Sequence, residues 1–286
     1  MGRAYLAVGT VTVLWAINFT VAKIAAREFD PFLIAACRVF ATAAVFYAFL
    51  PREERKIDRS DLKAFLPLSL LAIVLHQTCF VSGIKLTTPS HSAIIHVLIP
   101  VITAIAAWFL IRERISPLGM VGMAVAVVGA LIVVLGVPRS EIRGTLMGDL
   151  LTMIGITGFS FYTVLGRRQV ARVGSFRVVT FAFLLATPFM VPVLIAGLLR
   201  QDWHAVTWRG WTALPYTIVC ATMICYRLHI FALTRLTAGR VAAFTVLQPA
   251  LGTCVSVLFG EDRVTPTLLV GAAVALAGVV FVQWRR

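Results

Sequence analysis

Apolar residues along this chain fall in long runs, separated by short polar stretches. A run of about 20 apolar residues spans a bilayer, and it must be helical because its backbone polar groups find no water there. Strand-length alternation of apolar and polar residues is absent, which argues against an outer-membrane barrel. The pattern predicts an all-α integral membrane protein with ten transmembrane helices, at residues 4–25, 31–50, 64–84, 89–111, 117–137, 146–166, 176–198, 211–233, 239–260 and 266–284.

The polar stretches leave no room for a soluble domain. The longest, residues 51–61, is predicted to be a solvated loop. The first apolar run is too long for the core of a signal peptide and lacks a small-residue cleavage site, so we expect it to stay as a helix.

The two halves of the chain contain copies of one pattern. Residues 98–133 align without a gap on residues 247–282, which places Pro100 on Pro249. Five spans are predicted in each half, and an odd number makes the second copy enter the membrane from the opposite side. We therefore expect two inverted five-helix repeats, residues 1–140 and 141–286, in one membrane domain. Such folds bind substrate at mid-depth and work by alternating access.

Composition supports the membrane assignment and charge predicts its orientation. The chain is 60% hydrophobic and 13% charged, whereas a soluble domain carries about 25% charged residues. With the N-terminus inside, 16 of the 26 basic residues fall on the cytoplasmic side, seven outside and three within spans. This bias predicts a multi-pass protein of the bacterial inner membrane with both termini cytoplasmic. The net charge of +14 therefore reflects topology, and no nucleic-acid partner is expected.

Recurring local motifs suggest a family. Trp15-Ala16-Ile17-Asn18-Phe19 lies in the first span, and each half has a mid-helix proline, an acidic residue at the helix end, then Ser/Thr-Pro and spaced glycines. The whole chain thereby resembles the drug/metabolite transporter superfamily, specifically its EamA branch. The resemblance implies an inverted basket, with helices one to four and six to nine around a cavity and helices five and ten outside. It also implies export of amino acids or other metabolites, and the family's aromatic amino-acid exporters are nearest in length and character.

Polar residues inside the spans are candidates for substrate binding, because burying them is costly. All 12 carboxylates fall in loops or at helix ends, which argues against cation efflux through a buried glutamate. The predicted substrate-binding residues are Trp15, Asn18, His76, Gln77, His96, Ser160, Tyr162, Tyr226, Arg227 and Gln248. Packing and internal hydrogen bonding are the alternative for each. Arg227 is expected to hold a carboxylate, while Arg38 is expected to bind carbonyls or Asp30.

Two further features concern the helices themselves. Pro100 and Pro249 interrupt backbone hydrogen bonding at mid-depth, which predicts a kink that serves as a hinge and frees the His96 carbonyl; a static kink is the alternative. Small residues three or four apart line one face of helix five and one of helix ten, which predicts internal packing or, alternatively, a homodimer contact. These residues are Gly122, Ala126, Gly129, Gly271, Ala275 and Gly278.

The sequence lacks the residue patterns typical of enzymes, metal-binding proteins and ATP-driven pumps. No nucleophile with a base partner, metal cluster or GxxxxGK[ST] loop is apparent, so we expect no enzyme, metal or cofactor. The predicted function is a secondary transporter exporting aromatic or other neutral amino acids, by facilitated diffusion or histidine-linked proton coupling. Export of a nucleoside, sugar or organic anion is the alternative.

Overall fold

Each predicted span overlaps a helical segment of the structure, a computed structural model that describes residues 2–112, 117–135, 142–260 and 264–283. No strand occurs within these ranges. Six of the spans are continuous α-helices: α1 (Gly2–Glu28), α2 (Pro31–Phe49), α7 (Pro117–Leu135), α8 (Ile142–Val173), α9 (Ser175–Arg200) and α14 (Pro266–Gln283).

The other four spans change helix type midway. Two contain a π-helical segment: α3 (Arg59–Leu68), η2 (Ser69–Leu75) and α4 (His76–Leu86), then α10 (Trp208–Ile218), η4 (Val219–Ile224) and α11 (Cys225–Ala232). Two contain a 3₁₀ turn: α5 (Pro89–Ile95), η3 (His96–Leu98) and α6 (Ile99–Ile111), then α12 (Ala238–Ala243), η5 (Phe244–Leu247) and α13 (Gln248–Leu258). A separate 3₁₀ turn, η1 (Arg52–Arg55), lies in the loop after α2.

By length and composition, seven helical segments of the described residues can cross a membrane. The apolar stretches Pro117–Gly129 and Leu269–Gly278 are shorter. The ten-span inverted arrangement and the division into 1–140 and 141–286 stay predictions, and the boundary at residue 140 lies outside the described ranges.

Local sequence explains where several helices begin. The Asp30 side chain accepts a hydrogen bond from the Phe32 amide at 2.9 Å, and Pro31 occupies the first turn of α2. Thr88 accepts from the His91 amide at 3.3 Å ahead of α5. Each side chain satisfies an amide that the helix cannot pair, and proline in the first turn has no amide to leave unpaired.

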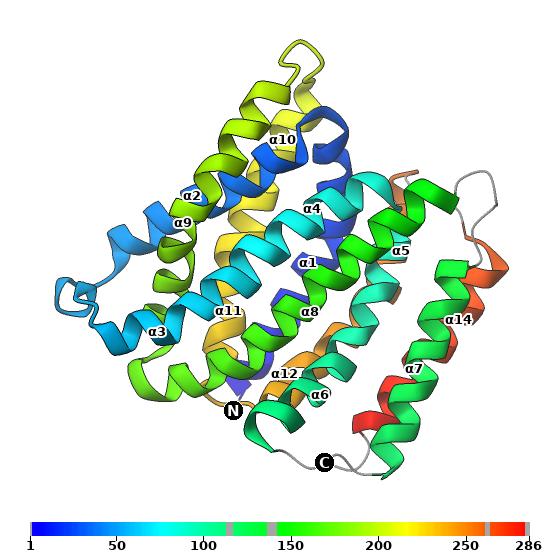
Figure 1. Ribbon diagram of the computed structural model, residues 1–286. Coiled ribbons are helices and arrows are strands. Elements are labelled where there is room, and N and C mark those ends of the chain that lie inside the picture. Colours follow the sequence, from blue (N-terminus) through cyan, green and yellow to red (C-terminus); the bar gives the residue numbers. More distant parts are fainter. Residues whose placement is uncertain (1, 113–116, 136–141, 261–263, 284–286) are drawn as a thin grey trace.

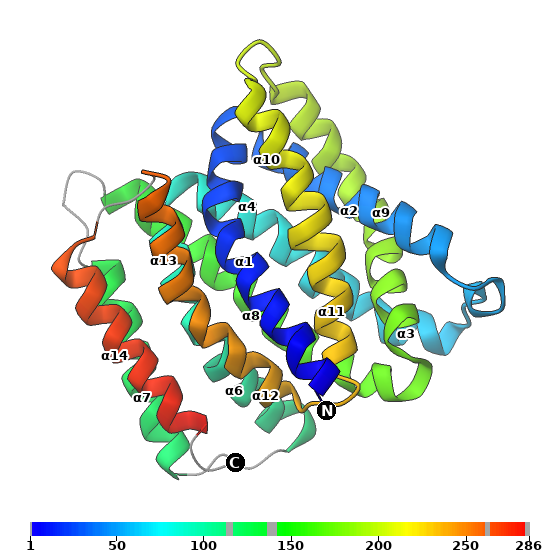
Figure 2. The same cartoon turned by 180° about the vertical axis from the view of Figure 1, so that it is seen from behind.

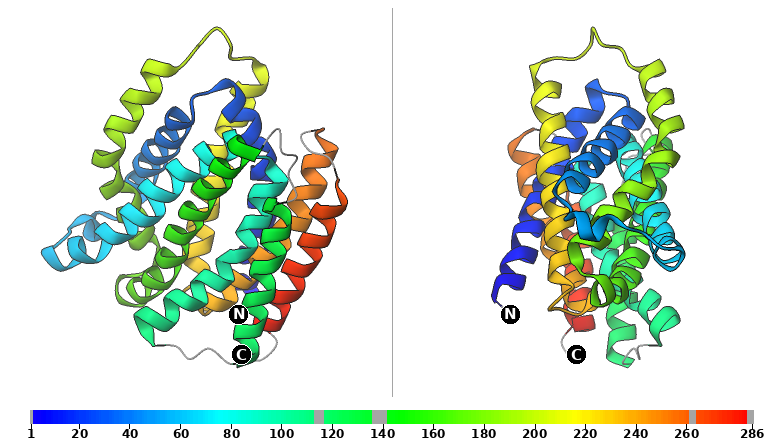
Figure 3. Two further views of the ribbon diagram at one scale, coloured as in Figure 1. Left: turned by 45° about the vertical axis from the view of Figure 1, so that its right-hand side comes forward. Right: turned by 90° about the vertical axis from the view of Figure 1, so that its left-hand side faces the viewer.

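The helices form two layers with a pair at each flank. Figure 1 shows α3, α4, α5, α6 and α8 in front, and Figure 2 shows α1, α10, α11, α12 and α13 on the opposite face. Figure 3 shows the two layers edge-on. Helices α2 and α9 pack together at one flank, and α7 packs against α14 at the other. The first turn of α1 and the last turn of α14 lie at the same end of the molecule.

The α7–α14 pair is held by the small residues that the sequence singled out. A Cβ added to Gly129 would lie 2.6 Å from the Ala275 Cα atom, and one added to Gly278 would lie 2.6 Å from the Gly122 carbonyl oxygen. The two small-residue faces therefore contact each other within the chain, as the internal-packing interpretation expects. A homodimer through α7 or α14 stays a prediction, and it would need their outward faces.

The π-helical segments follow prolines that the sequence analysis did not use. Pro67 lies inside α3 and Pro215 inside α10, just before η2 and η4. A proline lacks the amide of a normal helical hydrogen bond and crowds the preceding turn, and wider π turns occur at such irregularities. The Thr222 hydroxyl donates to the Thr217 carbonyl five residues earlier, at 2.7 Å.

Candidate functional site: a polar cavity between the two layers

A narrow cavity of about 30 Å³ lies between the layers. Its lining comes from α1, α2, α4, η3, α6, α8 and α13. The lining residues are Trp15, Asn18, Phe19, Arg38, His76, Phe80, His96, Ile99, Phe159 and Gln248.

Aromatic rings form the apolar wall of the cavity. Trp15 meets Phe159 edge to face, with ring centroids 5.4 Å apart, and the Phe19 ring lies 4.8 Å from the His96 ring. The Trp15 Nε1 donates to the Ala221 carbonyl at 2.8 Å. Since Ala221 belongs to η4, the irregular helix supplies the acceptor that holds this indole in place.

Besides Arg38, three side chains at the cavity keep a polar atom without a protein partner. These atoms, among the described residues, are the Asn18 Oδ1, the His76 Nδ1 and the Gln248 Nε2. The His96 Nδ1 lies 2.6 Å from the Ser92 carbonyl oxygen. Because a carbonyl only accepts, this nitrogen carries the proton, and in the neutral ring Nε2 is the acceptor. The cavity thus offers both donors and acceptors to a polar solute.

The cation at the cavity is Arg38. Its Nε donates to the Thr222 hydroxyl at 2.6 Å, and its guanidinium carbon lies 5.7 Å from the centre of the Phe80 ring. The side chain is 2% exposed. The expected pairing with carbonyls or Asp30 is therefore replaced by a hydroxyl of η4, which only the tertiary structure brings to α2.

Five of the ten predicted binding residues line the cavity: Trp15, Asn18, His76, His96 and Gln248. Tyr226 lies behind the wall, where its ring is 6.1 Å from that of Trp15 and its hydroxyl donates to the Ala72 carbonyl of η2 at 3.3 Å. Tyr162 is buried 6.1 Å from Tyr226, and its hydroxyl has no partner within the described residues.

The remaining three predicted residues lie elsewhere. Ser160 is buried in α8 and donates to the Ile156 carbonyl at 2.8 Å, as a packed helical serine does. Gln77 is buried in α4 beside His76 without lining the cavity. Arg227 is half-buried, with its guanidinium carbon 5.1 Å from the Phe176 ring centre and Nη1 3.3 Å from the Ser175 hydroxyl. Arg227 therefore faces the start of α9, away from the cavity.

Sequence reasoning did not place Phe19, Phe80, Ile99 or Arg38 at the cavity. Phenylalanine and isoleucine carry no signal of their own in a chain this apolar. Arg38 did carry one, because an arginine inside a span is costly, but its partner could not be read from the sequence.

The two prolines predicted to act as hinges each follow a 3₁₀ turn. Pro100 lies in the first turn of α6 directly after η3, and Pro249 lies in the first turn of α13 directly after η5. The His96 carbonyl, expected to be free, accepts the Ile99 amide within the 3₁₀ turn. Tightening to 3₁₀ geometry thus satisfies the group that a proline would otherwise leave unpaired. The hinge role of both prolines stays a prediction.

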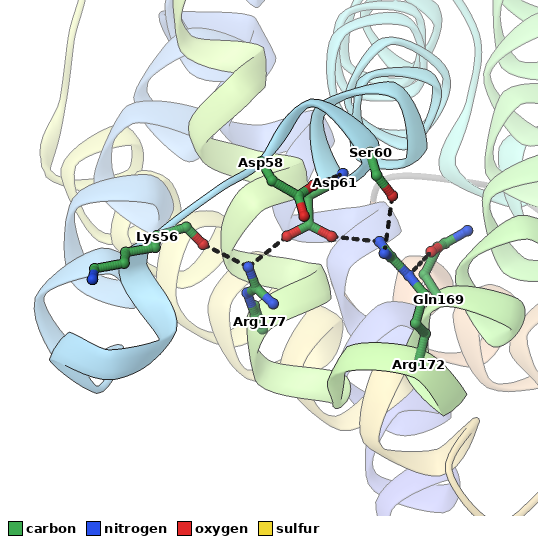
Figure 4. Close-up of polar contacts among 7 residues, drawn as sticks. All are labelled: Lys56, Asp58, Ser60, Asp61, Gln169, Arg172 and Arg177. Carbon is green, nitrogen blue, oxygen red and sulfur yellow. Dashed lines mark hydrogen bonds and ion pairs between the residues drawn. The ribbon is translucent and has the colours of Figure 1, made fainter.

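An ion-pair network centred on the buried Asp61 joins helix ends beside α3 (Figure 4). The Asp61 carboxylate accepts from Arg172 at the end of α8, at 2.6 Å, and from Arg177 at the start of α9. Arg177 also donates to the Lys56 carbonyl at 2.6 Å. Asp61 is 3% exposed, so one carboxylate holds two helices and the preceding loop together.

A second polar cluster lies near the other end of α8. Asp149 accepts from the Thr87 hydroxyl at 2.7 Å, and its other oxygen lies 3.3 Å from the His91 Nδ1. Lys23 of α1 donates to the Thr87 carbonyl at 2.6 Å. These contacts tie α1, α8 and the α4–α5 turn together, so both ends of α8 are held by charged groups.

Similarity to known proteins identifies the family. The model of the EamA-like transporter family matches residues 2–135 and 146–284. This chain belongs to the EamA-like transporter family. It is therefore a multi-pass membrane protein and a transporter, not an enzyme, and the resemblance seen in the sequence is confirmed.

The relatives of this EamA-like transporter are distant and of similar length. The uncharacterized transporter YetK of Bacillus subtilis is 22% identical over 96% of this chain and 85% of its own. A probable amino-acid metabolite efflux pump of Salmonella typhimurium is 24% identical over 94% of this chain and 91% of its own. One solved crystal structure shares the fold, with a TM-score of 0.71 at 21% identity over 99% of this chain and 97% of the other.

Proposed function

We propose that this EamA-like transporter exports small amino acids or amino acid-like metabolites, aromatic or other neutral ones, across the bacterial inner membrane by alternating access. The observation that carries the proposal is the cavity between the layers. Its lining combines aromatic rings, two amides, two imidazoles and one guanidinium. Among its described lining residues there is no carboxylate. Such a lining suits a solute with an apolar side chain, an anionic group and a hydrogen-bonding group.

The pairing of helices supports two inverted five-helix repeats as the machinery. Helix α1 contacts α10 and α11 from the other half, and α8 likewise contacts α4 and η2. Helix α1 also contacts α13, as α8 contacts α6. The contacts that α1 makes with the second half thus correspond to those that α8, its counterpart, makes with the first half. A twofold axis between the halves would produce this correspondence. The two stretches matched by the family model fall one in each half.

The relative from Salmonella typhimurium supports the substrate class, since its name describes an amino-acid metabolite efflux pump. Histidine-linked coupling draws support from His76 and His96, which both line the cavity. In this proposal both termini face the cytoplasm. Export of another organic anion is the second candidate, and Arg38 at the cavity is the observation that favours it.

The test is flux in proteoliposomes that contain the purified full chain. We expect saturable uptake of radiolabelled phenylalanine and leucine, with competition between the two. Uptake that is competed by a nucleoside or a sugar, but by no amino acid, would reject the substrate class. Protein-free liposomes serve as the control.

A further inference from the structure

The charge of Arg38 has no counter-charge within the described part of the chain. Ion pairs there join Asp149 to His91, and Asp61 to Arg172 and Arg177. The Arg38 guanidinium has one neutral partner, the Thr222 hydroxyl on its Nε. Its Nη1 is buried and has no hydrogen-bond partner among the described residues.

An arrangement of this kind is expensive if it serves packing alone. Moving a charged group out of water is energetically unfavourable unless a partner compensates for the lost hydration. A structural arginine in a protein interior normally has its donors satisfied. Arg38 is 2% exposed and lines the cavity, so its unpaired donor belongs to a side chain that borders the space proposed for a solute.

The contacts of Arg38 and the other lining residues of the cavity restrict what that solute can be. The Thr222 hydroxyl and the Phe80 ring position the guanidinium without neutralising it. The Asn18 Oδ1 is an unpaired acceptor that suits an ammonium or amide group. Phe19 and Phe159 provide apolar surface for a side chain. One ligand that satisfies all three features is a zwitterion with an apolar side chain.

We infer that Arg38 is the anion-binding residue of the cavity and that the transported solute carries a carboxylate. This inference rests on the proposed function and deepens it, because it selects amino acids and organic acids over amines, sugars and nucleosides. A guanidinium can bind a carboxylate through two parallel hydrogen bonds, and the unpaired Nη1 supplies one of them. It also assigns to Arg38 the role that the sequence suggested for Arg227.

A set of three related ligands tests the inference without any mutation. Binding to the detergent-purified full chain is measured by calorimetry for phenylalanine, for 3-phenylpropanoate, which lacks the amine, and for phenethylamine, which lacks the carboxylate. We expect the two carboxylates to bind and phenethylamine to bind at least about tenfold more weakly, since a hydrogen bond to a charged group contributes about 1.5–3 kcal/mol. Equal binding of phenethylamine, or no binding of either carboxylate, would overturn the inference.

Variants then assign the site to one residue. Arg38→Gln should weaken phenylalanine binding at least about tenfold, and Arg38→Lys should recover part of it because the charge remains. Arg200→Gln is the matched control, since it removes a guanidinium 5.2 Å from the Phe32 ring, outside the cavity. Thermal unfolding of each variant separates lost binding from lost folding.

Two results would contradict Arg38 as the anion-binding residue, and a third would contradict only the proposed transport function. Unchanged binding in Arg38→Gln, or loss in Arg227→Gln instead, would show that Arg38 is not the anion site. Carboxylate binding that depends on Arg38, with no flux in proteoliposomes, would leave the site in place and reject transport of these solutes.

Discussion

At the scale of single residues, two buried tyrosines illustrate how the surroundings of a hydroxyl decide whether it stabilises or destabilises the fold. Tyr226 and Tyr162 are both buried, and their rings lie 6.1 Å apart. The Tyr226 hydroxyl donates to the Ala72 carbonyl at 3.3 Å, whereas the Tyr162 hydroxyl has no partner in the described part of the chain. A hydrogen bond contributes about 0.5–1.5 kcal/mol net, and a buried unpaired group costs about 1–3 kcal/mol.

The two tyrosines therefore predict opposite effects of the same substitution. Tyr226→Phe should destabilise the protein by about 0.5–1.5 kcal/mol, because it removes a hydrogen bond to η2. Tyr162→Phe should leave stability unchanged or raise it, because it removes an unpaired hydroxyl. Thermal unfolding in detergent measures both. If Tyr162 binds substrate, as the sequence suggested, Tyr162→Phe also raises the KM for transport.

A lower melting temperature for Tyr162→Phe than for Tyr226→Phe would contradict this account. It would mean that the Tyr162 hydroxyl forms a hydrogen bond in the detergent-solubilised protein.

At the scale of elements, close helix packing and helix irregularities have different sequence signals. Glycines at matched positions predicted close packing of α7 and of α14 without naming the partner helix, since a missing side chain lets backbones approach; the structure shows that the two helices pack against each other. The π segments η2 and η4 had a weaker signal in Pro67 and Pro215. Both segments provide acceptors to other helices, through the Ala72 and Ala221 carbonyls.

The α7–α14 contact predicts that a single methyl group is not tolerated at its centre. In Gly129→Ala the new Cβ would lie 2.6 Å from the Ala275 Cα and 2.7 Å from its Cβ. We expect a loss of stability of about 1–3 kcal/mol from overpacking, measured as a lower melting temperature. Gly9→Ala in α1 is the control, because its Cβ meets nothing within 4 Å. Equal melting temperatures for the two variants would show that α7 and α14 do not pack as described.

At the scale of the whole molecule, the two layers must separate at one end at a time if alternating access is correct. The Asp61 network holds the start of α3 to the α8–α9 junction (Figure 4). The Asp149 cluster holds the far end of α8. These polar clusters lie on either side of the cavity along α8. The Asp61 network joins α3 and α8 of one layer to α9 at the flank, whereas the Asp149 cluster reaches the opposite layer through Lys23 of α1.

Asp61→Asn should loosen only its own end of the molecule. The neutral side chain weakens two charge-assisted hydrogen bonds, each of about 1.5–3 kcal/mol. We expect amide hydrogen exchange in α3 and in the first turns of α9 to accelerate about tenfold or more, with the α9–α10 end unchanged. Glu54→Gln in the exposed turn η1 is the control. Unaltered exchange in α3, or equal acceleration at both ends, would exclude a local closure.

The sequence by itself determined the positions of the helical segments, the membrane class and the family. Long apolar runs carry these properties locally, because a backbone in lipid has no alternative to internal hydrogen bonding. Half of the predicted binding residues, such as Asn18 and Gln248, line the cavity because burying a polar group in a span is costly wherever it occurs.

Only the tertiary structure decided which of the buried polar groups share one cavity. Arg38 and Arg227 look alike in the sequence, since each is a lone arginine in an apolar span. Packing sends Arg227 toward Ser175 and Phe176, and it brings Thr222 of another helix to Arg38. The direction in which a side chain points depends on helix rotation and on partners 50 to almost 200 residues away, as the separations of 52 and 184 residues in these two contacts illustrate. When a helix is apolar on every face, its hydrophobic periodicity reveals neither how the helix is rotated nor which distant residues it contacts.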